Sequence, residues 1–443
     1  MVPAPICLAA LLPDAAPPAW TVIPFALLLL SIALLPLLAP KWWHHRSSQA
    51  LVSAGFGVPA IAIVIWLDPA ALGHATLEYL AFVALLGSLF TISGGIRLAG
   101  RLAGTPGANT ALLAFGAVLA NLVGTTGAAM LLIRPFLRAN ESRRQRTHLV
   151  VFFILVVANC GGCLTPLGDP PLFLGFLRGV PFEWTLRLWP QWLTICSGLL
   201  VLFRIVDGAI QRREQAADSK DAKVAAGAGG TGHPVEPLRL EGRGNLVLLA
   251  AVAVVVLLSG AVVNPRFGET AALLSQAFVL LGLAGLSLRL TPAGLRTANG
   301  FSWGPLAEVA ILFAAIFVAM VPALALLRVK GAEAGIALPW QLFWGTGALS
   351  AFLDNAPTYL AFVAAAQHLP DEVVGTSHAA LEAIACGAVF FGAMTYIGNG
   401  PNFMVKAIAE ETGVRMPSFF GYLGWSVMLL GPLLLLTTFL FFA

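Results

Sequence analysis

The chain has 443 residues, of which 58% are hydrophobic and only 10% are charged. Soluble domains carry about 25% charged residues, so this composition excludes a set of soluble domains and indicates a protein covered by a bilayer. The net charge of +4 does not indicate nucleic-acid binding, because the Lys and Arg residues are scattered over loops. Five cysteines in apolar surroundings do not form a disulfide framework. The sequence contains no phosphate-binding loop for ATP, and we expect no resident cofactor.

Residues 1–19 contain no Lys or Arg and so lack the basic start of a signal peptide; we expect a short periplasmic tail. A membrane crossing needs about 20 apolar residues. Uninterrupted apolar runs lie near 20–40, 51–67, 76–97, 185–206, 245–263, 271–290, 304–327 and 418–442. Two regions, 108–138 and 339–366, predict re-entrant hairpins, and two more, 148–178 and 380–411, predict broken helices. The pattern predicts an all-α polytopic membrane protein with about 10–11 spans.

The distribution of positive charge predicts the orientation. With the N-terminus outside, the cytoplasmic segments hold 19 of the 25 Lys and Arg residues. This is the positive-inside bias of a multi-pass inner-membrane protein. The segment 207–243 is polar and rich in Gly and Ala, and we expect it to be a cytoplasmic linker without regular structure.

The two halves of the chain repeat each other. At an offset of 230 residues, the segment beginning at Glu78 aligns with the one beginning at Glu308, and GGCLTPLGDPPLF (161–173) aligns with FGAMTYIGNGPNF (391–403). The assigned orientation inverts one repeat relative to the other, a recurring plan of secondary transporters. The predicted organisation is a tail with two scaffold helices (1–75), a first repeat (76–206), the linker (207–243), scaffold helices (244–303) and a second repeat (304–443).

Four interruptions predict a shared site: GTTG (124–127), NCGGCLTPLGDPP (159–171), DNAPT (354–358) and TYIGNGPN (395–402). Non-helical backbone is tolerated at membrane depth only where it meets protein or a water-lined cavity. Gly relaxes the chain and Pro removes a backbone donor, so such breaks free polar groups for ligands.

Two carboxylates, Asp169 and Asp354, lie within these interruptions. An ionisable residue at the bilayer centre costs at least about 2.5–3.5 kcal/mol, so such residues are usually functional. The alternative is that each carboxylate caps the N-terminus of a half-helix. We expect both to bind a transported Na⁺ ion or protons, with Asp354 as the principal exchanging group.

Neutral side chains around the carboxylates supply further oxygens for a hard cation, or amide N–H groups for an anion. An alternative is that the amides only hold the breaks together. The candidate ion- or substrate-binding residues are Asn159, Thr165, Asn355, Thr358, Thr395, Asn399, Asn402, Thr125 and Thr126.

Other ionisable or reactive residues have simpler interpretations. Glu78 and Glu308 fall near predicted membrane edges, which favours an interfacial role or an interaction with the helix dipole over proton transfer. Cys160 and Cys163 have the spacing of a redox or metal motif, but a single CxxC within a break favours packing. Ser and His are absent from the breaks, so an intramembrane enzyme is not indicated.

The motifs LDNAPT (353–358), TPLGDPP (165–171) and TYIGNGPN (395–402) resemble those of the ion transporter superfamily over roughly residues 70–420. The version ANCGGCLTPLGDPPLF is similar to that of NhaD-type sodium/proton antiporters and of proteins described as citrate carriers. The resemblance implies a homodimer with a scaffold and a transport domain that moves as an elevator. The tips here lack the Ser-Asn-Thr signature of dicarboxylate carriers, and the first tip lacks the acidic residues usual in the antiporters.

These observations predict a secondary active transporter, with exchange of Na⁺ for H⁺ as the main interpretation. Two carboxylates that bind either the cation or protons couple the two fluxes by competition alone. The alternative is cation-coupled transport of citrate or another small carboxylate, which would require basic residues or clustered half-helix N-termini at the site. Expected partners are membrane lipid, small ions and a second copy of the chain.

Overall fold

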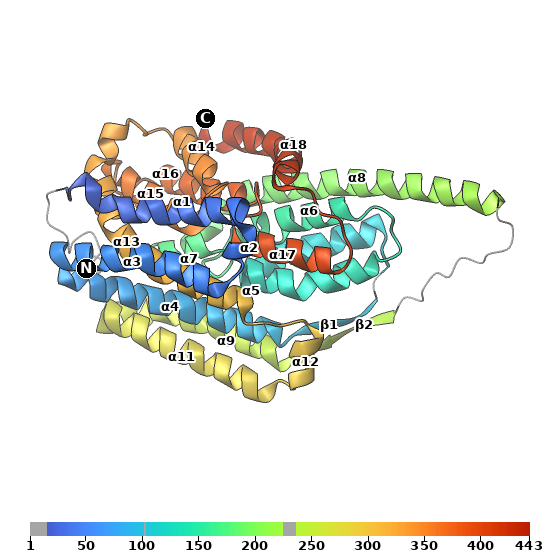
Figure 1. Cartoon of the computed structure of the whole chain (residues 1–443), viewed down its shortest axis with the longest axis horizontal. Coiled ribbons are helices and arrows are strands. Elements are labelled where there is room, and N and C mark those ends of the chain that lie inside the picture. Colours follow the sequence, from blue (N-terminus) through green and yellow to red (C-terminus); the bar gives the residue numbers. More distant parts are fainter. Residues whose placement is uncertain (1–15, 102, 225–235) are drawn as a thin grey trace.

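The computed structural model describes residues 16–101, 103–224 and 236–443. The expected periplasmic tail therefore lies mostly outside the described residues, as do Cys7 and part of the expected linker. The described chain is 79% helical and forms a bundle of roughly parallel and antiparallel helices along one long axis (Figure 1).

Nine helical segments in the described ranges are long and apolar enough to cross a membrane, which confirms a polytopic, almost all-helical membrane protein. Their main helices are α1 (Ile23–Leu38), α3 (Arg46–Leu67), α4 (Pro69–Gly94), α5 (Pro106–Ala139), α8 (Trp189–Val224), α9 (Gly244–Leu258), α11 (Glu269–Leu290), α13 (Gly304–Lys330) and α18 (Phe419–Thr437). Shorter helices at their ends or in the loops are α2 (Pro40–Trp43), α10 (Asn264–Phe267) and α12 (Ala293–Ala298).

The two regions expected to be broken helices are each divided into two short helices. The first consists of α6 (Thr147–Val156) and α7 (Pro170–Leu177), and the second of α16 (His378–Phe391) and α17 (Gly400–Glu411). Both α7 and α17 begin at a Gly or Pro followed by Pro. Proline has no backbone N–H and restricts the residue before it, so each sequence can start a helix here but cannot continue one through.

Both regions expected to be hairpins fold back on themselves. In α5 the chain reverses at Gly124, whose φ of 79° lies in the region that favours glycine. The side chains of Asn109 and Asn140, near the two ends of α5, are consequently 2.9 Å apart and hydrogen-bonded. In the second hairpin, α14 (Pro339–Ser350) and α15 (Asn355–Ala365) are joined at residues 351–354.

The segment 207–243 has more regular structure than its polar composition led us to expect. Helix α8 continues to Val224, because residues 207–224 are rich in Ala, Gln, Glu, Arg and Lys, which favour helices. Beyond the undescribed residues, β2 (Glu236–Glu241) pairs antiparallel with β1 (Arg97–Arg101). Arg97 and Glu241 form an ion pair of 3.3 Å across this two-stranded ribbon.

Buried and exposed faces are arranged as a membrane protein requires. Helices α6 and α16 are buried along almost their whole length. Large hydrophobic side chains on the outer helices face outward; Phe278, Phe420 and Phe439 are 78–81% exposed. An exposed apolar surface of this extent is stable only against hydrocarbon.

Helices α14 and α16 pack through glycines, which predicts a sensitive position. A Cβ added at Gly387 would lie 2.5 Å from the backbone oxygen of Phe343, so Gly387→Ala forces the helices apart. We expect a loss of about 1–3 kcal/mol in the free energy of unfolding, seen as a lower thermal midpoint of the purified protein. Gly285→Ala in α11 is the control, because no described heavy atom lies within 4 Å of its Cβ. An equal effect of both substitutions would contradict this packing.

Candidate functional site

All four interruptions meet at the carboxylate of Asp169, which is 2% exposed. Its Oδ1 accepts hydrogen bonds of 3.0 Å from Thr125 Oγ1, at the tip of α5, and of 3.0 Å from Asn399 Nδ2, just before α17. Its Oδ2 accepts a hydrogen bond of 2.6 Å from Asn355 Nδ2, at the start of α15. Segments more than 200 residues apart in the chain therefore surround one buried carboxylate.

The side chain of Asp169 does not cap a helix. Asp169 is the N-cap residue of α7, yet its side chain accepts no backbone hydrogen bond from that helix. Pro170 and Pro171 occupy the next two positions and have no N–H to offer. Its oxygens point instead to Thr125, Asn355 and Asn399.

Asp354 has a different role in the same structure. Its Oδ1 accepts a 3.0 Å hydrogen bond from the backbone N–H of Ala356, so it caps α15. Its side chain is only partly buried, and it lies within electrostatic range of Asp169. The geometry therefore places Asp169, rather than Asp354, at the centre of the polar cluster.

A chain of three asparagines supports the cluster. Asn399 Nδ2 also donates to Asn159 Oδ1 at 3.1 Å, and Asn159 Nδ2 donates to Asn402 Oδ1 at 2.6 Å. Asn402 Nδ2 then donates to the backbone oxygens of Gly392 and Thr395 at 2.8 Å. All three side chains are buried, so this network joins the two broken helices and replaces hydrogen bonds that their backbones have lost.

The two threonines of the breaks make matching contacts. Thr165 Oγ1 donates to the backbone oxygen of Asn121, and Thr395 Oγ1 donates to that of Ala351. Donors and acceptors in the two bonds are each separated by 230 residues. Each threonine therefore ties a break to the hairpin arm beside it, and neither hydroxyl contacts Asp169.

The other two expected threonines, Thr358 and Thr126, do not hydrogen-bond to Asp169 through their hydroxyls. Thr358 Oγ1 donates to the backbone oxygen of Asp354 within its own helix. Thr126 is half-buried at the first tip, but the hydroxyl that contacts Asp169 is that of its neighbour Thr125.

Asn355 offers an oxygen that no other described group uses. The residue is fully buried, and its Oδ1 has no hydrogen-bond partner among the described residues, while its Nδ2 holds Asp169. A buried acceptor without a partner is costly. Placed beside a carboxylate, it is suited to a hard cation, which binds carboxylate and amide oxygens.

Asn121 belongs to the site but was not among the expected residues. Its Nδ2 donates to the backbone oxygen of Gly161 at 2.7 Å, and its Oδ1 accepts from the N–H of Leu164 at 2.7 Å. It thereby holds the first break against the arm of α5. The signal in the sequence was one Asn in the otherwise apolar run 111–123, three residues before GTTG.

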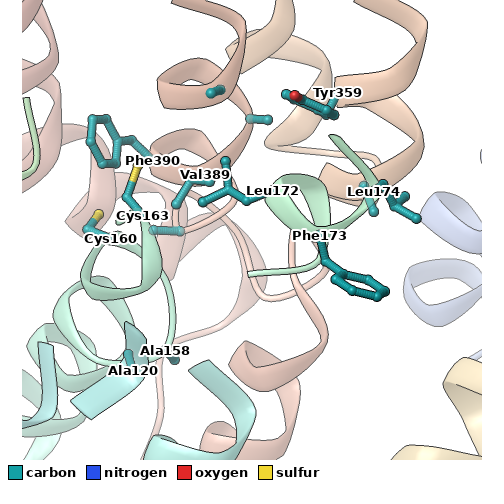
Figure 2. Close-up of a cluster of buried hydrophobic side chains, with 14 of the residues drawn as sticks. Ala120, Ala158, Cys160, Cys163, Leu172, Phe173, Leu174, Tyr359, Val389 and Phe390 are labelled. Carbon is teal, nitrogen blue, oxygen red and sulfur yellow. The ribbon is translucent and has the colours of Figure 1, made fainter. Parts of the chain in front are cut away.

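Cys160 and Cys163 are buried beside the break. Figure 2 shows them among hydrophobic side chains that include Leu172, Val389 and Phe390. In the part of the chain that the structure describes, no group of three or more His, Cys, Asp or Glu residues is placed to hold a metal ion. Their surroundings fit two small packing residues.

The basic residues nearest to the breaks make contacts elsewhere. Lys406 pairs with Glu410 at 2.8 Å and lies over the ring of Tyr396, and Arg134 packs against Gly300. None of the ion pairs found in the described ranges includes Asp169 or Asp354.

Glu78 is paired with a residue of another helix. It lies more than two turns inside α4, is 1% exposed and pairs with Arg178. The sequence could not show this pairing, because Arg178 is 100 residues away.

Residues 14–442 match the model of a protein family described as "Putative citrate transport". The chain belongs to this family. The match covers nearly the whole sequence and confirms the resemblance to the ion transporter superfamily and to citrate carriers. Membership of a citrate transport family, with the membrane-helical fold, indicates a transporter. No curated protein matches the sequence.

Proposed function

We propose that the chain is a secondary active transporter that moves a small carboxylate of the citrate class together with a cation bound at Asp169. The observation that carries this proposal is the buried Asp169 carboxylate, held by three neutral donors and, among the described residues, by no basic side chain. A negative charge in this setting is neutralised when Na⁺ or H⁺ binds, so that the site exchanges an ion without a resident cofactor.

Oxygen atoms suited to the cation lie on both sides of Asp169. The free Oδ1 of Asn355 and the hydroxyl of Thr125 come from the two hairpin tips, and Asp354 adds a second negative charge nearby. Hard cations such as Na⁺ favour ligand sets of this kind. Because each ligand comes from a different segment, cation binding would fix the segments relative to one another.

The carboxylate substrate is supported by the family description and by helix geometry. The N-termini of α7, α15 and α17 meet at the cluster, because Asp169, Asn355 and Asn399 are their first or capping residues. Helix N-termini carry partial positive charge and favour anions. Together with a bound cation, they offset the repulsion between Asp169 and an incoming carboxylate.

Exchange of Na⁺ for H⁺ without an organic substrate is the second candidate. The absence of any ion pair to Asp169 or Asp354 among the described residues favours it, since a free anion would lack a basic partner there. The family description favours transport of a citrate-class carboxylate over ion exchange alone.

We also propose that the chain forms two inverted repeats, that its N-terminus lies outside an inner membrane, and that it works as a homodimer with an elevator-type transport domain. The matched threonine contacts 230 residues apart support the repeats. The positive-inside bias supports the orientation. The resemblance to the ion transporter superfamily supports the dimer and the elevator movement.

Cation binding at Asp169 predicts a stabilisation that depends on this carboxylate. Ligand at 100 times its dissociation constant stabilises a folded protein by about 2.7 kcal/mol, so saturating NaCl should raise the thermal midpoint relative to choline chloride. Asp169→Asn should abolish the increase. Asp354→Asn should keep most of it, because Asn also caps a helix. If the Asp169→Asn variant keeps the full increase of the thermal midpoint in NaCl, the cation binds elsewhere.

A transport assay distinguishes the two candidate functions. In proteoliposomes, an inward Na⁺ or H⁺ gradient should drive accumulation of labelled citrate, and Asp169→Asn should reduce it at least about tenfold, equivalent to about 1.4 kcal/mol. A pH-sensitive dye inside the vesicles reports exchange without citrate. Na⁺-driven proton movement with no citrate uptake would establish the second candidate.

Cysteine labelling tests the orientation. Ser142→Cys lies in an exposed cytoplasmic loop of the proposed topology, and Glu333→Cys lies in an exposed outside loop. With Cys7 replaced by Ser, an impermeant thiol reagent added to intact cells should label only the cysteine at position 333. The cysteine at position 142 should react only after the cells are opened. Labelling of both positions from one side would rule out the proposed topology.

A further inference from the structure

A second cluster of ionisable side chains lies apart from the Asp169 site. It consists of His74 and Glu78 on α4, Arg178 at the end of α7, and Glu269 at the start of α11. His74 Nε2 lies between two carboxylates, 3.6 Å from Glu78 Oε1 and 3.4 Å from Glu269 Oε1. Arg178 donates to Glu78 Oε2 at 3.0 Å. We refer to these four residues as the α4 charge cluster.

The charges of the α4 charge cluster do not balance without an additional proton. Two carboxylates and one guanidinium leave a net charge of −1 when His74 is neutral. The side chain of Glu78 is only 2% exposed, and its Oε1 has no hydrogen-bond partner among the described residues. An uncompensated charge in such surroundings is costly. A proton on His74 makes the cluster neutral and places an imidazolium between the two carboxylates.

Other elements packed on α4 do not supply this missing charge. The charged groups that act on His74 are Glu78, Glu269 and Arg178. Helices α3, α5, α9 and α13 also contact α4, but in the described ranges they add no member to these ion pairs.

The α4 charge cluster is connected to the Asp169 site by one short helix. Asp169 directly precedes α7 and Arg178 directly follows it, so about 12 Å of helix separates the two. Helix α7 also packs on α15, where the hydroxyl of Tyr359 lies against Gly175. A change in the Arg178–Glu78 pair therefore acts on the helix that positions Asp169.

We propose that the α4 charge cluster is a proton-binding site separate from Asp169, with His74 as the residue that takes up the proton during transport. This inference rests on the proposed function. His74, Arg178 and Glu269 are 12%, 13% and 22% exposed and lie within two turns of the ends of α4, α7 and α11, so the imidazole is open to proton uptake at the surface of the molecule. The proton binds a ring nitrogen and leaves by the same bond, and no other bond changes.

Two variants make the cluster neutral without a proton. His74→Lys supplies a permanent positive charge at the same position. Glu269→Gln removes one negative charge at the most exposed member and preserves hydrogen bonding. Purified variants that elute as wild type on gel filtration would be reconstituted for two assays with labelled citrate. The first assay measures accumulation of labelled citrate driven by a pH gradient. The second measures exchange of labelled for unlabelled citrate (counterflow), and this exchange needs no net proton movement.

The expected result is a selective loss of coupling. Both variants should retain counterflow within about twofold of wild type and lose pH-driven accumulation at least about fivefold, the lower range of coupling free energies between sites. His368→Gln is the control, because this exposed histidine lies outside both sites. Wild-type accumulation in either folded variant would overturn the proposal, as would parallel loss of counterflow and accumulation in both.

Failure of the proposed function gives a different pattern. Wild-type protein would then show neither citrate accumulation nor counterflow. The same variants would be measured by Na⁺-driven proton movement with the internal dye. Loss of that movement in Glu269→Gln, with His368→Gln unaffected, would support the proton site, and unchanged movement would overturn it.

Discussion

The Asp169 carboxylate accepts no backbone N–H from its own helix, because two prolines follow it and the N–H of Leu172 bonds to the backbone oxygen of Asp169 instead. Its charge must therefore be solvated by side chains that other segments bring to it. Thr125, Asn355 and Asn399 supply this solvation, and each lies at a point where a helix is interrupted. The interruptions and the carboxylate depend on each other. Without the breaks the donors could not reach Asp169, and without the polar cluster the broken backbone would lose hydrogen bonds inside an apolar core.

This dependence explains the distribution of polar and small residues in the interior. The asparagines near the breaks bind both to one another and to freed backbone oxygens, so a single residue type satisfies donors and acceptors. Glycines permit the close approach that these short bonds need. Gly162 and Gly168, for example, lie close enough that a Cβ on either one would meet the backbone of the other.

Much of this arrangement could be predicted from the sequence, because Gly and Pro clusters in apolar runs mark breaks, and a repeat at an offset of 230 residues pairs them. Hairpin polarity led us to expect Asp354 as the principal exchanging group, which stays a prediction; the contacts place Asp169 at the centre of the polar cluster. The difference in capping has a local signal: Pro-Pro after Asp169 removes two of the N–H groups that a cap could bind, whereas Asp354 precedes Asn-Ala and binds the N–H of Ala356. The Arg178–Glu78 pair and the place of Asn121 depend on tertiary contacts that no local pattern contains. The polar composition of 207–224 was outweighed by its helix-forming residues.

The ribbon of β1 and β2 has a consequence for how the first half of the chain is anchored. It joins the residues that follow α4 to those that precede α9, and Asn245 at the start of α9 donates to the backbone oxygen of Gly95 at 2.9 Å. Helices α5 to α8 therefore leave and rejoin the rest of the molecule at one place. The strand pairing holds these two connections together, so they cannot separate without loss of the ribbon's hydrogen bonds. Within the first half of the chain, the segment that carries Asp169 thus begins and ends at the same tether.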